Sequence, residues 1–148
     1  MLEADKKVAS CLCGNVKIAA AKINPEFTVC HCDTCRTWGG GPLFAVQCGT
    51  EVKFEGTGSI KEYQSSPWAT RGFCQHCGTH LFYRLHKTGG YNMPVGLFPD
   101  LPNLTMTMQY FSDQRPDYYC FSNQTQEMTK AEIEAYFASI QSQHSLRS

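Results

Sequence analysis

Seven cysteines in three short groups constrain this chain more than any other feature of its sequence. The groups follow the patterns C-x-C, C-x-C-x-x-C and C-x-x-C, and they contain Cys11 and Cys13, then Cys30, Cys32 and Cys35, then Cys74 and Cys77. Zinc prefers four tetrahedral ligands and binds thiolates well. A C-x-x-C turn that bends around a metal ion is often followed by glycine, and Gly14 and Gly78 follow the two outer groups. The spacing therefore predicts a zinc protein.

The seven clustered cysteines divide most simply into four and three. The middle group is compact enough to hold one ion alone, which leaves four sulfurs from the outer groups for a second ion. Four sulfurs close a zinc site, whereas three leave a coordination position for water or substrate. We therefore expect a structural zinc on Cys11, Cys13, Cys74 and Cys77, and a catalytic zinc on Cys30, Cys32 and Cys35. Free or redox-active cysteines are the alternative, and iron–sulfur clusters fit less well because they need complete four-cysteine sites.

Composition narrows the class of protein. The chain has nine cysteines, an odd number, and in a reducing compartment clustered cysteines are more often metal ligands than disulfides. The first residues, MLEADKKVAS, lack the apolar run of a signal peptide, and no stretch has the length of a membrane span. We expect a cytoplasmic protein. Its net charge of zero argues against a dedicated nucleic-acid binder.

The length of 148 residues fits one zinc-binding domain over 1–148 with a core of its own. Short segments rich in β-branched and aromatic residues, punctuated by glycine and proline, predict a mainly β fold. The expected strands are 15–23, 43–48, 51–54, 59–63, 80–85, 93–98 and 105–111. Exposed sheet edges favour pairing of chains, so a homodimer is one expected assembly.

One helix is expected, over about 129–143. Thr129 and Glu132 form a capping-box pattern at its start. Apolar residues then recur at helical spacing, namely Ile133, Tyr136, Phe137 and Ile140. We expect this stripe to pack on the core.

The remaining cysteines and two of the histidines are expected to have structural rather than metal-binding roles. Cys48 and Cys120 stand apart in apolar surroundings, and both are expected in the core. His31 and His76 lie inside cysteine groups, and we expect them beside the ligands or exposed rather than bound to metal.

Two arginines and one loop have candidate roles around the cysteine groups. Arg36 directly follows Cys35, and Arg71 lies three residues before Cys74, so either could offset local negative charge or hold an anionic substrate. Asp33 is expected in a turn. The segment 37–42 is expected to be a loop beside the middle group, with Trp38 either lining a pocket or packing.

At these residues the sequence resembles a family. The segments CLCGNV, CHCDTCRTWGGGPLF and RGFCQHCGTHLFYRL, with YNMPVGLF and PDYYCF, resemble the glutathione-dependent formaldehyde-activating enzymes, a family that includes centromere protein V. The order and spacing of all seven cysteines match, and the resemblance covers about 8–122. Within 108–121 the chain has Met108, Gln109 and Tyr118, where many relatives carry a histidine early and a tryptophan late.

The resemblance implies a β-tent fold of small antiparallel sheets. It implies a structural zinc on the outer cysteines and a catalytic zinc on Cys30, Cys32 and Cys35, in agreement with the spacing. It also implies a carbon–sulfur lyase activity, in which glutathione and formaldehyde combine reversibly to S-hydroxymethylglutathione. The expected partner is a small-molecule substrate such as glutathione, with no membrane or nucleic acid.

Three functions therefore remain open from the sequence. The first is a zinc-dependent carbon–sulfur lyase acting on a glutathione adduct or a related thiol–carbonyl compound. The second is a non-catalytic zinc module that binds a partner. The third is a metal or thiol sensor in which the three-cysteine site is a labile reservoir. The open coordination position favours the enzyme, with activation of a thiol as its mechanism.

Overall fold

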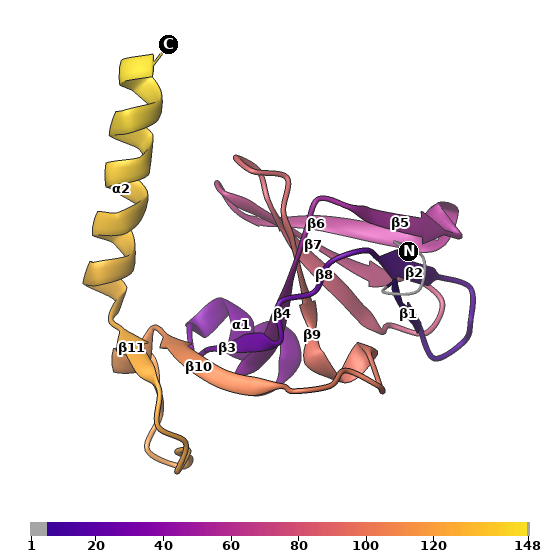
Figure 1. The fold of residues 1–148 in the computed structure, drawn as a ribbon, viewed down its shortest axis with the longest axis horizontal. Helices are drawn as coiled ribbons and strands as arrows, with labels where there is room; N and C mark the ends of the chain where they lie inside the picture. Colours follow the sequence, from indigo (N-terminus) through magenta and orange to yellow (C-terminus); the bar gives the residue numbers. More distant parts are fainter. Residues whose placement is uncertain (1–5, 148) are drawn as a thin grey trace. The chain divides into compact units, whose positions relative to one another are not determined.

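The computed structural model describes residues 6–147, with side chains as far as residue 139. The fold is mainly β, as expected (Figure 1). Its strands are β1 Lys7–Ser10, β2 Lys17–Ala20, β3 Glu26–Cys30, β4 Leu43–Gly49, β5 Val52–Glu55, β6 Ile60–Ser66, β7 Ala69–Cys74, β8 His80–Leu85, β9 Tyr91–Pro94, β10 Thr105–Tyr110 and β11 Gln126–Met128. The helices are α1 Asp33–Gly39 and α2 Lys130–Arg147, with short 3-10 turns η2 Thr57–Ser59, η3 Val95–Leu97 and η4 Ser112–Gln114.

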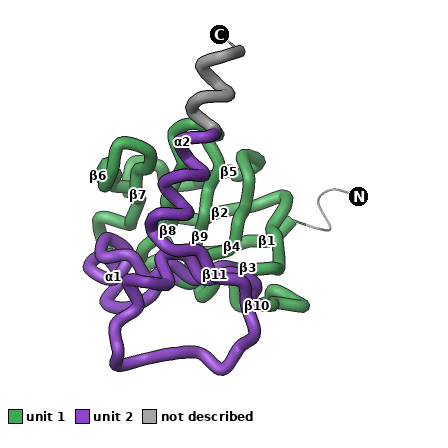
Figure 2. The backbone as a smooth tube through the Cα atoms, turned by 90° about the vertical axis from the view of Figure 1, so that its left-hand side faces the viewer, with its two compact units in different colours: residues 1–27, 44–105 green, residues 28–43, 106–148 purple. Residues whose placement is uncertain are grey.

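The backbone divides into two compact units (Figure 2). Unit 1 contains residues 1–27 and 44–105, and unit 2 contains residues 28–43 and 106–148. The four outer cysteines all belong to unit 1, and the three middle cysteines all belong to unit 2. Each candidate metal group can therefore be described within a single unit.

Unit 1 is built from antiparallel strands around an aromatic core. Strands β1, β2 and β5 form a three-stranded sheet, and β4, β9, β8, β7 and β6 are neighbours in that order. In β2 and β5 the side chains alternate in burial, as period-2 geometry requires. The rings of Phe54, Phe82 and Tyr91 lie 5.0–5.5 Å apart in the core.

Strand β7, which pairs with β6 and β8, is buried along almost its whole length. A Cβ at Gly72 would lie only 2.3 Å from the ring of Phe82. Glycine is therefore required for the Phe82 ring to pack directly against the backbone of β7. The sequence patterns gave no strand here because a continuously buried segment lacks the alternation of a half-exposed strand.

Unit 2 contains β10 and β11 as neighbours and the two helices. Strand β11 runs parallel to β10, which differs from the expected antiparallel pairing. Helix α1 was not expected. It corrects the prediction of a turn at Asp33 and of a loop over 37–39, whereas residues 40–42 form a loop as predicted. Cys32 is its N-cap and Gly40, in the left-handed conformation, is its C-cap, so both ends of this short helix are satisfied.

The C-terminal helix is confirmed, and α2 extends to Arg147. Its capping box is formed as predicted, with the Glu132 carboxylate accepting from the N–H of Thr129 at 2.8 Å and the Thr129 hydroxyl accepting from the N–H of Glu132 at 3.3 Å. The predicted packing of its apolar stripe is wrong in part. Ile133 is buried, but Tyr136 is 58% exposed, and the side chain of Ile140 lies outside the described residues.

The remaining differences are in short or irregular strands. The patterns missed β1, β3, β7 and β11, while the segment expected as one strand over 93–98 is the end of β9 followed by η3. Strands of three to five residues contain too few alternations to be distinguished from loops.

Candidate metal centres

Two similar turns hold the four outer cysteines. After β1, the N–H of Cys11 donates to the carbonyl of Val16 at 3.0 Å, and the N–H of Gly14 donates to the carbonyl of Cys11 at 3.1 Å. After β7, the N–H of Cys74 donates to the carbonyl of Thr79, and the N–H of Gly78 donates to the carbonyl of Cys74. Gly14 and Gly78 have φ of 83° and 78°, so the turns need the permissive residue expected from the sequence.

The four sulfurs of these turns converge. All four Sγ atoms lie within 4.8 Å of one another, and Cys13 Sγ lies 3.6 Å from Cys11 Sγ and 3.7 Å from Cys74 Sγ. Ligands about 2.3 Å from a tetrahedral zinc would be about 3.8 Å apart. The group thus has the composition and the spacing that zinc requires.

Thr79 supports this group and was not identified from the sequence. Its hydroxyl oxygen lies 3.2 Å from Cys77 Sγ and accepts from the N–H of Leu12 at 3.1 Å. Because Leu12 lies between the first two cysteines, Thr79 connects the two turns across 67 residues. The hydroxyl of Thr79 and nearby backbone N–H groups lower the pKa of Cys77 to about 5.

The neighbouring thiols raise the pKa of Cys13, whereas the pKa of Cys77 is lowered. The Asn15 backbone favours the Cys13 thiolate, but burial and the thiols of Cys11, Cys77 and Cys74 outweigh it and raise the pKa of Cys13 to about 11. A divalent cation would favour the thiolate form of these neighbouring sulfurs, which is the behaviour expected of a thiolate metal site.

The three middle cysteines also come together, from β3 and α1. Cys30 is the last residue of β3, Cys32 caps α1 and Cys35 is buried in its first turns. Their Sγ atoms lie within 4.8 Å of one another, and the N–H of Cys35 donates to Cys32 Sγ at 3.3 Å. The side chains of Cys32 and Cys35, together with burial, raise the pKa of Cys30 strongly. These three sulfurs also suit a cation, with fewer ligands than a closed zinc site.

Arg36 holds the middle group together. Its Nε donates to the carbonyl of His31 at 2.9 Å, and its guanidinium forms an ion pair with Asp33. The N–H of Asp33 also donates to the side chain of Gln114 at 3.2 Å.

The second arginine singled out from the sequence, Arg71, lies in unit 1. It is buried, donates to the hydroxyl of Ser65 at 2.9 Å and lies 5.5 Å from the ring centre of Tyr83.

His31 is buried and has a partner at each ring nitrogen, which the sequence did not indicate. Its side chain is fully buried, with Nδ1 2.6 Å from the Tyr119 hydroxyl and Nε2 2.8 Å from Gln109 Oε1. Burial lowers the pKa of His31. These partners lie 88 and 78 residues away, so no local pattern could have identified them.

The other singled-out residues have mixed outcomes. Cys48 is buried as expected, and burial raises its pKa to about 12. The expectation that Cys120 lies in the core is wrong, because this cysteine is exposed. Tyr119 and Phe121 both contact the His31 ring, so the residue between them faces away. His76 is exposed, and Trp38 lies half-buried on α1.

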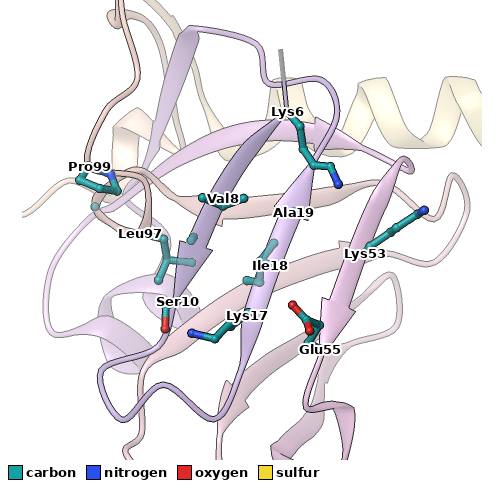
Figure 3. Close-up of a pocket in the computed structure, with 12 residues that line it drawn as sticks. Lys6, Val8, Ser10, Lys17, Ile18, Ala19, Lys53, Glu55, Leu97 and Pro99 are labelled. Atoms are coloured by element: carbon teal, nitrogen blue, oxygen red, sulfur yellow. The ribbon is translucent and has the colours of Figure 1, made fainter. Parts of the chain in front are cut away.

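A pocket of about 770 Å³ lies on the outer face of the sheet β1–β2–β5 (Figure 3). Lys6, Lys17 and Lys53 and the carboxylate of Glu55 surround a floor of small and apolar residues that includes Val8. None of the residues that line it is a cysteine or a histidine. The cysteine groups are therefore the stronger candidates for chemistry.

The fold and the two cysteine groups define a class, namely small mainly β proteins with cysteine clusters that could hold metal and are compatible with zinc. Comparison with known proteins identifies the family. Residues 6–114 match the glutathione-dependent formaldehyde-activating enzymes, and the chain belongs to this family. The resemblance expected from the sequence is therefore confirmed.

Individual relatives agree with this assignment. A Schizosaccharomyces pombe protein described as an uncharacterized lyase is 34% identical over 125 residues, which are 84% of this chain and 91% of the relative. A crystal structure of a Rhodobacter sphaeroides protein superposes with a TM-score of 0.55 at 22% identity, covering 64% of this chain and 89% of the other. The similarity to the Rhodobacter sphaeroides structure shows a shared fold. Among the helices of residues 6–147, none is long and apolar enough to cross a membrane.

Proposed function

We propose that this protein is a zinc-dependent carbon–sulfur lyase that forms or cleaves a glutathione adduct such as S-hydroxymethylglutathione. The observation that carries the proposal is the convergence of three, not four, sulfurs from Cys30, Cys32 and Cys35 within 4.8 Å, in a member of this family. Three protein ligands are typical of catalytic zinc, because the fourth position stays open to substrate.

The four-sulfur group is assigned a structural role. Cys11, Cys13, Cys74 and Cys77 fill all the positions of a tetrahedral ion and connect two turns that are far apart in the sequence. A structural zinc of this kind contributes on the order of 10–16 kcal/mol to folding. Its loss would unfold unit 1 rather than change the reaction alone.

The reaction itself is an addition without net oxidation. A bond forms between the thiol sulfur and the carbonyl carbon, and the thiol proton ends on the carbonyl oxygen. Zinc in the three-cysteine group would lower the pKa of a substrate thiol or polarise the carbonyl. Because three thiolates donate much charge, we favour activation of the thiol. The backbone between Cys30 and Cys32 is held by Arg36, which donates to the His31 carbonyl, and by the Tyr110 carbonyl, which accepts from the His31 N–H.

Turnover tests this proposal directly. Glutathione and formaldehyde would be mixed with the purified zinc-loaded protein, and adduct formation and cleavage would be followed by NMR exchange spectroscopy above the uncatalysed rate. Cys32→Ser should abolish the enzymatic rate, whereas Cys120→Ser, which changes an exposed cysteine outside both groups, should not. Equal rates for wild type and Cys32→Ser would refute the catalytic role, and a metal-binding or partner-binding role would then replace it.

A further inference from the structure

His31 lies between two of the three clustered cysteines, and all its polar groups are engaged. Its N–H donates to the carbonyl of Tyr110 at 3.0 Å, and its carbonyl accepts from Arg36 Nε at 2.9 Å. Its ring nitrogens lie 2.6 Å from the Tyr119 hydroxyl and 2.8 Å from Gln109 Oε1. The residue is thus fixed by both its backbone and its side chain.

The hydrogen-bond partners determine which ring nitrogen carries the proton. Arg115 Nη1 lies 2.9 Å from Gln109 Oε1, and a guanidinium can only donate, so this amide oxygen is an acceptor. The Gln109 NH₂ group donates in turn to the Thr125 hydroxyl at 3.0 Å. His31 must then donate from Nε2–H to Gln109. In the neutral ring Nδ1 is left as an acceptor, and the Tyr119 hydroxyl donates to it.

Stacking adds a second constraint on the same ring. The rings of Tyr119 and His31 are 5.5 Å apart at an angle of 25°, and Phe121 lies 6.0 Å from His31 on the same segment. At the far end of the network, Arg115 lies 3.8 Å from a carboxylate oxygen of Glu127 on β11. The plane of the imidazole and both its hydrogen bonds are therefore set by residues 109–127.

The position of His31 in the chain gives this network a consequence for the cysteines. In extended chain, side chains two residues apart point the same way and the residue between them points the opposite way. His31 is buried on one side, so Cys30 and Cys32 are both directed to the other, where they meet Cys35. A rotation at residue 31 would move two of the three sulfurs at once.

We propose that Tyr119 and Gln109 are positioning residues that act through His31 to hold the sulfurs of Cys30 and Cys32 in the geometry that binds metal. The inference rests on the proposed function, because it takes the three-cysteine group as the catalytic metal centre. Residues that orient a metal ligand typically change metal affinity about 10- to 100-fold when they are mutated. Here the orienting contacts reach the ligands through the residue between them.

The test measures metal binding rather than turnover. Tyr119→Phe keeps the aromatic ring but removes the hydroxyl, and Tyr118→Phe is the matched control because Tyr118 is 76% exposed. Zinc affinity would be measured by competition with a chromophoric chelator, and the ligand geometry by the visible spectrum of the cobalt-substituted protein. We expect Tyr119→Phe to weaken zinc binding at the three-cysteine site about tenfold or more and to change the cobalt spectrum of that site. The other site, and Tyr118→Phe at both sites, should match wild type.

A second pair of variants separates positioning from general loss of structure. Gln109→Leu removes the acceptor of His31, whereas Gln109→Glu keeps it, so the glutamate variant should recover most of the zinc affinity lost in the leucine variant. Long-range ¹⁵N NMR of wild type should show His31 protonated at Nε2. Unchanged zinc affinity and cobalt spectrum in Tyr119→Phe, or a His31 ring protonated at Nδ1, would overturn the inference. Two zinc ions without turnover would instead refute the proposed reaction and leave this inference standing.

Discussion

Gly72 on strand β7 provides a quantitative test of how unit 1 is packed. A Cβ at this position would lie 2.3, 2.5 and 2.8 Å from three ring atoms of Phe82. Carbon atoms in contact prefer about 3.5–4.0 Å, so the ring would have to move by roughly 1 Å. The Phe82 ring is 1% exposed and lies 5.0 Å from Tyr91 and 5.5 Å from Phe54, so it has little room to move.

Gly72→Ala should therefore destabilise the zinc-loaded protein by about 1–3 kcal/mol, the usual cost of overpacking. At about 2–4 °C per kcal/mol for a chain of this size, the melting temperature should fall by roughly 2–12 °C. Gly58→Ala is the control, because a Cβ there meets nothing within 4 Å. Thermal denaturation followed by circular dichroism measures both variants.

A double-mutant cycle identifies the contact responsible. Phe82→Leu removes the ring that the new methyl group would meet, so the double variant Gly72→Ala/Phe82→Leu should lose less stability than the sum of the two single variants. Additive effects, or a Gly72→Ala variant as stable as Gly58→Ala, would show that Phe82 does not pack against the backbone of β7.

Three further predictions concern the cysteines. Thr79→Val should weaken zinc binding at the four-cysteine site about tenfold or more in chelator competition, because it removes the donor to Cys77. Thr88→Val is the control and should have no effect, because the exposed Thr88 hydroxyl lies outside both cysteine turns and accepts from the N–H of Gly90. Alkylation of the zinc-loaded protein at neutral pH, followed by mass spectrometry, should modify exposed Cys120 well before buried Cys48. Because burial raises the pKa of Cys48 from 9.0 to about 12, its contribution to stability is complete below pH 9 and is lost as the pH rises toward 12. Denaturation at pH 8 and pH 10.5 should show a smaller loss of stability in Cys48→Ala than in wild type, and an equal loss would contradict this assignment.

Much of the cysteine arrangement was predictable because metal sites of this kind are built from local spacing. A C-x-x-C-G turn contains its own geometry, and the left-handed conformation of Gly78 is what its position after Cys77 implies. The division into four and three followed from counting ligands, and the sulfurs converge in those two groups. The capping box of α2 was likewise visible because its hydrogen bonds join residues three apart.

What the sequence could not provide were contacts between distant residues and elements without a clear period. Tyr119 and Gln109 meet His31 only after the chain has folded, and Thr79 gains its role from Leu12 on a distant turn. Helix α1 is seven residues long and starts at a cysteine cap, so its pattern was too short to distinguish from a loop.

The helix α2 shows a different limit of pattern reasoning. Apolar residues at helical spacing predicted its existence correctly, yet Tyr136 on that stripe is 58% exposed. Periodicity indicates which residues share a face of a helix. It does not indicate how much of that face is covered by the rest of the protein. In this chain Ile133, in the first turns, is buried.

We propose that the chain binds two zinc ions, one in a closed four-cysteine site and one in an open three-cysteine site. The most direct measurement is the zinc content of freshly purified wild type, Cys32→Ser and Cys120→Ser, determined by elemental analysis before and after mild chelation. We predict two zinc ions per chain in wild type and Cys120→Ser, one of them removed by mild chelation, and one firmly held ion in Cys32→Ser. A single zinc ion in wild type, or two firmly held ions in Cys32→Ser, would contradict it.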